Sequence, residues 1–232
     1  MNTMMNYFGL FWCIVMSTSL SLYGQEGSKT YSLRQGQTLD FIFINTKVGV
    51  EEEIKQYFKE VYPVASAAGY NRLPGLKVMS SPSQGNYHPD IVVTGFWNSY
   101  QSRTSFLEKI LDKSPDFYQT RREIWSTFNL VYFDLQEDVS FSIQPGKYYT
   151  VTNLWLMDPS DIDTMLAKWN QAAAKAGGKN ILTLSGGRSP SGYFYTPALL
   201  MITEWNSKGA WMEGKTAQFG QEVKHVEQWE VH

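Results

Sequence analysis

The sequence predicts an α+β fold: two tandem ferredoxin-like β-α-β-β-α-β repeats that pack as an α+β barrel within one chain. One observation is an internal repeat, because positions 45–99 align with positions 153–207 without a gap and with 14 identities. The other is hydrophobic periodicity, which follows the same order of strands and helices in both halves. The 232 residues suffice for two units of about 100 residues each.

The identities form an ordered block rather than a scatter. The first-half positions, each matched by the same residue type at one constant offset, are Asn45, Ile54, Ala65, Ala68, Gly69, Leu76, Ser81, Pro82, Ser83, Tyr87, Pro89, Trp97, Asn98 and Ser99. The expected divisions of the chain are a signal peptide (1–24), an N-terminal extension (25–37), repeat 1 (38–136), a linker (137–147) and repeat 2 (148–232). The linker contains Pro145-Gly146, a turn-forming pair.

In repeat 1, β-rich alternation predicts the first strand and helical spacing of apolar residues predicts the first helix, which stops at Gly69. The expected strands are 40–48, 73–80, 91–97 and 130–135, and the expected helices are 50–68 and 100–128, the second bent near Pro115.

In repeat 2, the expected first helix starts at Asp158-Pro159, where a capping carboxylate precedes a proline at the first helical position. The expected strands are 148–157, 180–184, 198–205 and 227–232, with a second helix over 208–226.

The N-terminal segment 1–24 contains no Asp, Glu, Lys or Arg and has an apolar centre from Tyr7 to Met16. This pattern is typical of a secretory signal peptide cleaved after a small residue such as Gly24, and it predicts an exported, periplasmic or secreted protein. A membrane anchor is the alternative, although the apolar run is short for a span. The only cysteine, Cys13, lies in this segment, so no disulfide is expected after cleavage.

Composition excludes some classes of function. The net charge of −2 and the absence of a long basic run argue against nucleic-acid binding. The three histidines, His88, His225 and His232, show no metal-ligand spacing, so no metal site is expected.

The order of elements, and a third strand that ends in Trp-Asn-Ser before a helix, resemble the dimeric α+β barrel superfamily. Its members include antibiotic-biosynthesis-monooxygenase-like, haem-degrading monooxygenase, EthD-like and NIPSNAP-like proteins. The resemblance implies a pocket lined by a first-strand Asn and a third-strand Trp, here Asn45 with Trp97 and Asn153 with Trp205. Haem-degrading members add a histidine on the second helix, where this chain has Leu107 and Lys215.

The candidate ligand-binding residues are Asn45, Trp97, Asn153, Trp205, Glu204, Lys215, Tyr87, His88 and Tyr195. A strand Asn, if buried, needs a hydrogen-bond partner, which is either a ligand or a neighbouring loop. The tryptophans line a pocket or pack in the core, and the Ser-Pro-Ser and Tyr-x-Pro segments form turns or border a pocket. Glu204 and Lys215, which replace Phe96 and Leu107, favour a working pocket in the second repeat.

Three functions stay open. The first is an exported protein that binds a small, partly apolar molecule between sheet and helices, without a cofactor. The second is a monooxygenase, either cofactor-independent or, with lower expectation, dependent on haem. The third is a structural or partner-binding module with a solid core. The chain is expected to be a monomeric pseudo-dimer or a homodimer of tandem chains.

Overall fold

The computed structural model describes residues 28–190, 194–215 and 220–232. The expected signal peptide lies outside the described residues. No helix in the described ranges is long and apolar enough to cross a membrane.

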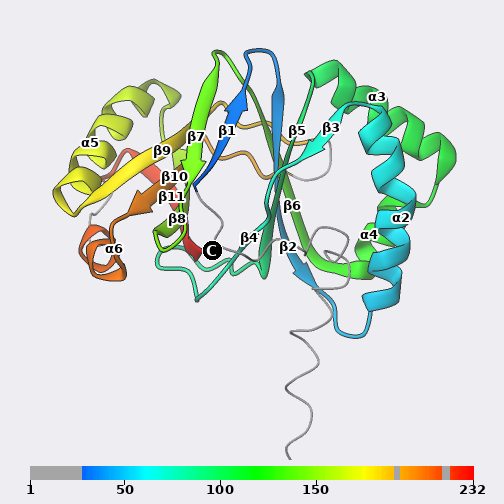
Figure 1. Cartoon of the computed structure of the whole chain (residues 1–232), viewed down its shortest axis with the longest axis horizontal. Coiled ribbons are helices and arrows are strands. Elements are labelled where there is room, and N and C mark those ends of the chain that lie inside the picture. The colour runs from blue at the N-terminus through cyan, green and yellow to red at the C-terminus, as the bar shows by residue number, and fades with distance from the viewer. Residues whose placement is uncertain (1–27, 191–193, 216–219) are drawn as a thin grey trace, which may run out of the picture.

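Repeat 1 forms an antiparallel sheet covered by helices on one face (Figure 1). Its elements are β2 (Thr38–Thr46), α2 (Glu51–Ala67), β3 (Tyr70–Arg72), β4 (Leu76–Lys77), β5 (Ile91–Trp97), α3 (Tyr100–Lys113), α4 (Phe117–Ile124) and β6 (Trp125–Asp134). The strand order is β3-β5-β2-β6, and β4 also pairs with β5. The order of strands and helices is the predicted ferredoxin-like one.

Repeat 2 has the same order, and its helices lie on the opposite flank of the molecule (Figure 1). Its elements are β8 (Tyr148–Leu156), the 3-10 helix η1 (Pro159–Asp161), α5 (Ile162–Lys175), β9 (Gly178–Ser185), β10 (Leu199–Trp205), α6 (Lys208–Gly214) and β11 (Val223–Val231). The strand order is β11-β8-β10-β9. The predicted α+β class with two tandem repeats is confirmed.

Local hydrogen bonds explain several of the repeated residues. The Ser99 hydroxyl accepts from the Ser102 amide at 3.1 Å at the start of α3, and the Ser207 hydroxyl accepts from the Ala210 amide at 3.1 Å at the start of α6. Gly69 and Gly177 follow the first helices with φ of 92° and 82°, a conformation that favours glycine.

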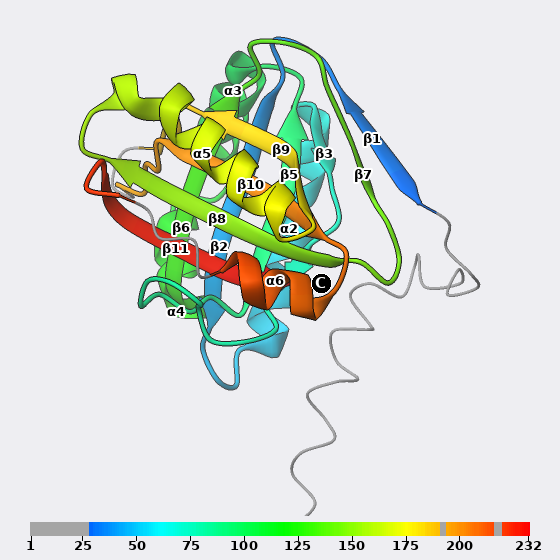
Figure 2. The same ribbon diagram turned by 90° about the vertical axis from the view of Figure 1, so that its left-hand side faces the viewer.

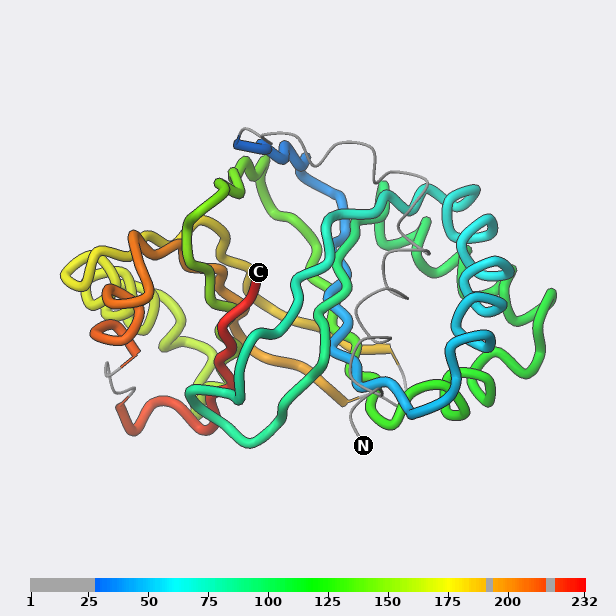
Figure 3. Tube along the Cα trace, turned by 60° about the horizontal axis from the view of Figure 1, so that its bottom comes forward, coloured from blue at the N-terminus to red at the C-terminus, as the bar shows by residue number. Residues whose placement is uncertain are grey.

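The two sheets join at both edges and close a barrel. On one side, the chain after β4 runs along β11: the amides of Lys77 and Ser83 donate to the carbonyls of His232 and Gln228, both at 2.9 Å (Figure 3). On the other side, Tyr132 of β6 and Arg188 exchange two backbone hydrogen bonds, at 2.8 and 2.9 Å. The barrel predicted from two copies within one chain is therefore present.

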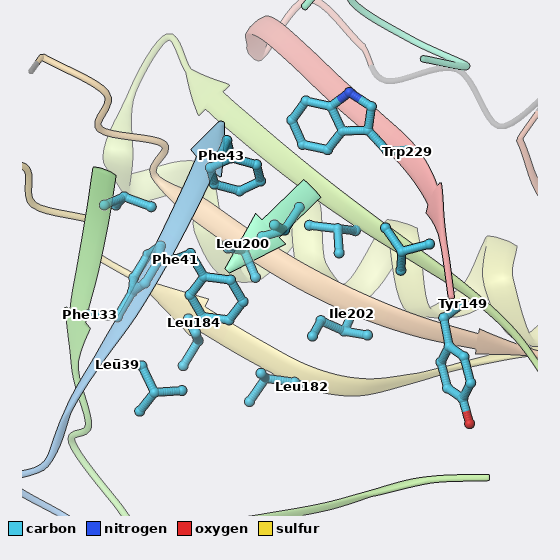
Figure 4. Close-up of a cluster of buried hydrophobic side chains, with 14 of the residues drawn as sticks. Leu39, Phe41, Phe43, Phe133, Tyr149, Leu182, Leu184, Leu200, Ile202 and Trp229 are labelled. Carbon is cyan, nitrogen blue, oxygen red and sulfur yellow. The ribbon is translucent and has the colours of Figure 1, made fainter. Parts of the chain in front are cut away.

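Side chains fill the space between the sheets. Residues from β2, β6, β9, β10 and β11 meet there, including Phe41, Phe43, Phe133, Leu184 and Trp229, all at most 4% exposed (Figure 4). A further apolar cluster lies between each sheet and its own helices, one in each repeat. Among the described residues, buried apolar side chains thus pack the space between the two sheets.

The extension and the linker, for which no secondary structure was predicted, contain a pair of strands. Strands β1 (Lys29–Leu33) and β7 (Val139–Ile143) form a two-stranded antiparallel ribbon (Figure 2). The alternate residues Val139, Phe141 and Ile143 pack against the barrel core, which explains why the ribbon forms. The pairing joins segments that are distant in sequence, such as Lys29 with Ile143, so local pattern does not reveal it.

Three predicted boundaries were wrong. The helix expected to Phe128 ends at Ile124, because the β-rich residues from Trp125 onward pair with β2. The helix expected to Val226 ends at Gly214, and β11 begins at Val223. Of the strand expected over 73–80, only β4 (Leu76–Lys77) forms; β3 ends earlier, at Arg72, and Pro74-Gly75 separates the two.

The sheets also correct the equivalence of Asn45 and Asn153. Val92 and Leu200 are matching residues of the third strands. Val92 pairs with Phe43 and Leu200 pairs with Asn153, so the counterpart of Asn153 in the sheet is Phe43. The first strands are therefore shifted by two positions relative to the alignment of the repeats. The connection to the first helix restores the register, since it spans 47–50 in repeat 1 and only 157–158 in repeat 2.

Candidate functional site

A cavity of about 90 Å³ lies between the sheet of repeat 1 and helices α2, α3 and α4. It is smaller than the roughly 150 Å³ engineered cavity that binds benzene. Aromatic and aliphatic side chains form most of its wall, and Tyr62, which is 47% exposed, is among them. The lining residues that carry the argument are Asp40, Tyr57, Trp97, Arg103, Phe106 and Arg121.

Three charged side chains are buried in this wall. Asp40 of β2, Arg103 of α3 and Arg121 of α4 are 4%, 5% and 7% exposed. The Trp97 indole Nε1–H donates to Asp40 Oδ2 at 2.8 Å, and Arg103 Nε lies 3.8 Å from the same oxygen. The result is an ion pair that is too long for a direct hydrogen bond.

Arg121 is held differently. Its Nε donates to the Tyr57 hydroxyl at 2.8 Å. Its guanidinium lies over the rings of Phe117 and Phe128, 4.0 and 4.4 Å from their centroids. Such cation–π contacts stabilise a buried cation whose water has been removed.

Two buried polar atoms at the cavity lack a hydrogen-bond partner among the described residues: Asp40 Oδ1 and Arg103 Nε. A buried donor or acceptor without a partner costs about 1–3 kcal/mol, and more for charged groups. Two of the three such atoms in the described ranges thus belong to one ion pair at one cavity.

Burial raises the pKa of Asp40, and this effect exceeds the opposing ones of Arg103, the Trp97 hydrogen bond and Arg121. The pKa of the neighbouring Tyr70 is also raised, first by burial and then by the charge of Asp40. The carboxyl group therefore sits where its ionised form is disfavoured by lost solvation and only partly supported by its partners.

In repeat 2, the corresponding layer between the sheet and its helices has neutral side chains at the positions of Asp40 and Arg103. By sheet register Thr150 occupies the position of Asp40, and at the repeat offset Trp211 occupies that of Arg103. The Trp205 indole donates to the Thr150 hydroxyl at 3.0 Å, as Trp97 donates to Asp40. The ring of Trp205 contacts that of Trp211 at 5.3 Å. A neutral hydroxyl and an indole thus replace a buried ion pair.

Two glycines let Trp205 fill its layer. A Cβ added at Gly178 or Gly214 would lie 2.5 or 2.3 Å from the Trp205 ring. The residues at the equivalent positions of repeat 1 are Tyr70 and Phe106, whose rings flank Trp97 at 4.9 and 5.0 Å. The glycines therefore allow the Trp205 indole to occupy space that rings take up around Trp97.

The sequence-predicted residues fall into separate places. Trp97 lines the cavity, whereas Trp205 is fully buried in a filled core. Asn45 donates to the His88 carbonyl at 2.7 Å and to Asp90 at 3.3 Å, which is a bond to a neighbouring loop. The Tyr87 hydroxyl donates to the Phe43 carbonyl at 3.0 Å, and His88 is exposed.

Asn153 and Tyr195 do come together, at the seam between the sheets. Asn153 donates to the Tyr195 hydroxyl at 2.8 Å, and that hydroxyl donates to Glu227 at 2.5 Å. Burial, together with the charge of Glu227, raises the pKa of Tyr195. The other Glu227 oxygen lies 3.3 Å from His225 Nε2. The third unpartnered atom, Asn153 Oδ1, belongs to this network.

Glu204 and Lys215, the two residues that favoured a pocket in repeat 2, are not among the residues that line the cavity of repeat 1. Glu204 accepts from the Tyr149 hydroxyl at 3.0 Å and lies 3.9 Å from Lys147, while Lys215 ends α6. The cavity between Asp40 and Arg121 lies in the first repeat instead.

Haem does not fit the residues present by the route of the haem-degrading members. Leu107 packs among apolar residues of the α3 layer, and Lys215 ends α6. None of the cavity-lining residues is a histidine.

Sequence reasoning missed Asp40, Arg103 and Arg121, although each leaves a signal. Asp40 interrupts the apolar run Leu39–Ile44. Arg103 shares a helical face with Phe106 and Ile110, and Arg121 shares one with Phe117 and Ile124. A charge on an apolar face indicates either a buried pair or a site.

Neither a protein-family model nor a curated protein matches the chain. Solved structures share its fold. Chlorite dismutase from Candidatus Nitrospira defluvii, in complex with imidazole, superposes with a TM-score of 0.50 at 9% identity over 86% of this chain and 92% of that chain. An anthrone oxidase-like protein gives a TM-score of 0.48 at 16% identity over 87% and 94%. The similarity to chlorite dismutase shows the tandem ferredoxin-like fold.

Proposed function

We propose that the protein binds a small, mainly apolar molecule in the cavity between the sheet and helices of repeat 1. The observation that carries this proposal is the difference between the repeats. Repeat 1 keeps a buried Asp40–Arg103 pair beside a cavity, whereas repeat 2 fills the same layer with Thr150, Trp205 and Trp211.

The energetics support a role in binding. Replacing a buried ion pair by apolar groups of similar volume is often neutral or stabilising by about 1–4 kcal/mol. Repeat 2 forms the same fold with a neutral pair, so the fold itself does not require the charges. Hydrogen bonds from a bound ligand to the unpartnered atoms would explain why repeat 1 has the charged pair.

The wall suits a ligand with an apolar body. Small-molecule sites are concave and mainly apolar, with a few polar groups that fix orientation. Here the rings of Tyr57, Trp97, Phe106 and Phe128 form the apolar surface, and Asp40 and Arg103 supply the polar groups. The proposal is for binding, since no observation at this site favours a monooxygenase reaction.

Nuclear magnetic resonance (NMR) of the indole N–H groups tests the proposal, with toluene as an apolar probe. The indole signals of Trp97 and Trp125, which both line the cavity, should shift and saturate. Those of Trp205 and Trp211 in repeat 2 serve as internal controls and should stay in place. Ala65→Leu, which places a larger side chain at the cavity wall, should abolish the shifts. Unchanged Trp97 and Trp125 signals at saturating toluene would refute the proposal.

We also propose that the protein is exported. The charge-free N-terminal segment 1–24 supports this. Cell fractionation followed by N-terminal sequencing tests it, with a new N-terminus near Gln25 expected. A protein that stays in the cytoplasm with Met1 intact would contradict export.

A further inference from the structure

We propose that the ligand of the repeat 1 cavity carries an uncharged hydroxyl group that bridges Asp40 Oδ1 and Arg103 Nε. This inference rests on the proposed binding function and names the chemical group that the site recognises. Its basis is that the two unpartnered atoms at the cavity are complementary, one an acceptor and the other a donor.

A hydroxyl group can serve both atoms at once. Its hydrogen can be donated to Asp40 Oδ1, while an oxygen lone pair accepts from Arg103 Nε. Both residues line the cavity, and their side chains already approach to 3.8 Å, so one atom can reach both. The other carboxylate oxygen is already held by the Trp97 indole, which fixes the orientation of Asp40.

Other groups match this pair less well. A carboxylate ligand has only acceptors when it is ionised, so it would leave an ionised Asp40 without a donor and place a second negative charge beside it. An ammonium group has only donors and would leave Arg103 Nε unsatisfied. A hydrocarbon satisfies neither atom. The hydroxyl also suits a protonated Asp40, because it can accept a hydrogen bond as readily as donate one.

The rest of the ligand is expected to be apolar and small. The cavity volume of about 90 Å³ restricts the buried part of the ligand to a compact group. The ring centroids of Trp97 and Phe106 lie 5.0 Å apart beside the ion pair, and both rings offer aromatic surface to the ligand. Tyr62, half-exposed among the lining residues, marks the side on which a larger ligand extends toward solvent.

The test compares phenol, toluene and benzoate, which share a ring and differ in the polar group. Binding to the full chain is followed by NMR at pH 7 through the Trp97 indole N–H, whose acceptor is Asp40. Phenol should bind about tenfold or more tightly than toluene, since it satisfies buried atoms that toluene leaves unpaired. Benzoate should bind more weakly than phenol.

The Arg103→Met variant removes the donor but keeps an unbranched side chain of similar length. It should reduce the preference for phenol over toluene to less than about threefold. Thr150→Val, which removes the hydroxyl that Trp205 contacts in repeat 2, is the matched control and should leave that preference unchanged.

The outcomes separate this inference from the proposed function. If toluene or benzoate binds as tightly as phenol, the hydroxyl inference is wrong while binding in the cavity stands. A phenol preference that persists in folded Arg103→Met also overturns the inference. If none of the three probes shifts Trp97, both the inference and the proposed function fail.

Discussion

The Asp40–Arg103 pair predicts a distinctive pattern of stability in single and double variants. The perturbations are Asp40→Thr, Arg103→Met and the two together. Threonine is chosen because Thr150 shows that a hydroxyl at this position accepts a hydrogen bond from the tryptophan. Both wild-type side chains are at most 5% exposed, so neither charge is solvated once its partner is gone.

Each single variant should lose about 3–5 kcal/mol of unfolding free energy, because it leaves an uncompensated buried charge. The double variant should match the wild type or exceed it by about 1–4 kcal/mol, because it removes both charges and both unpartnered atoms. The coupling between the two sites should therefore be about 6 kcal/mol or more, well above the deviation from additivity of about 0.5 kcal/mol or less that is usual for distant residues.

Urea unfolding followed by circular dichroism at pH 7 measures these free energies, with equal slopes required for a valid comparison. Thr150→Val is the control in repeat 2 and should cost about 1 kcal/mol through one lost hydrogen bond. A double variant that loses as much as the two singles combined would show that the two side chains of the pair stabilise the fold independently, without the expected coupling. Retention of the Asp40–Arg103 pair in repeat 1 would then need no ligand to explain it.

Three further predictions concern the cavity, its titration and the seam. Ala65→Leu should leave the unfolding free energy within about 1 kcal/mol of wild type, because the larger side chain fills a cavity. Ala173→Leu, at the matching position in the packed core of repeat 2, should cost about 1–3 kcal/mol. Thermal unfolding compares the two variants, and equal losses would contradict the difference in packing. Because burial raises the folded-state pKa of Asp40, which faces Arg103, Arg121 and Tyr70, its contribution to stability is full below the unfolded value of 3.8 and is lost as pH rises through the raised pKa. Urea unfolding between pH 3 and 8 should thus show wild type losing stability relative to Asp40→Asn as pH rises, and a difference that is flat or opposite in sign would refute it. Tyr195→Phe should cost about 1–3 kcal/mol by removing the hydroxyl that bonds to Asn153 and to one oxygen of Glu227, yet leave toluene binding in repeat 1 unchanged. Weakened binding would show that the seam and the cavity are coupled.

The fold could be predicted from sequence because its signals are local or repeated. The Trp-Asn-Ser block marks the end of β5 and β10, and the serine of this block caps the next helix in both repeats. The same reasoning could not find β1 and β7, because neither strand is paired with a neighbour in sequence. It also misaligned Asn153 with Asn45, since the shift of the first strands is hidden in a short connection.

The candidate site was harder to predict because identity between repeats points to shared packing rather than to function. Trp97 and Trp205 are the same residue, yet one lines a cavity and the other fills a core, and glycines at 178 and 214 make the difference. The residues that distinguish the site, Asp40 and Arg103, are those that the repeats do not share. A search for charges on apolar faces would have found them.

Native mass spectrometry of protein purified from its own host tests directly whether a small molecule binds in the repeat 1 cavity. Wild type and the Asp40→Thr/Arg103→Met double variant are prepared side by side under gentle conditions. We expect an additional small mass on the wild type that is released on denaturation, carries a hydroxyl group and is missing from the double variant. A folded double variant that retains the same ligand would contradict the assignment of binding to the repeat 1 cavity.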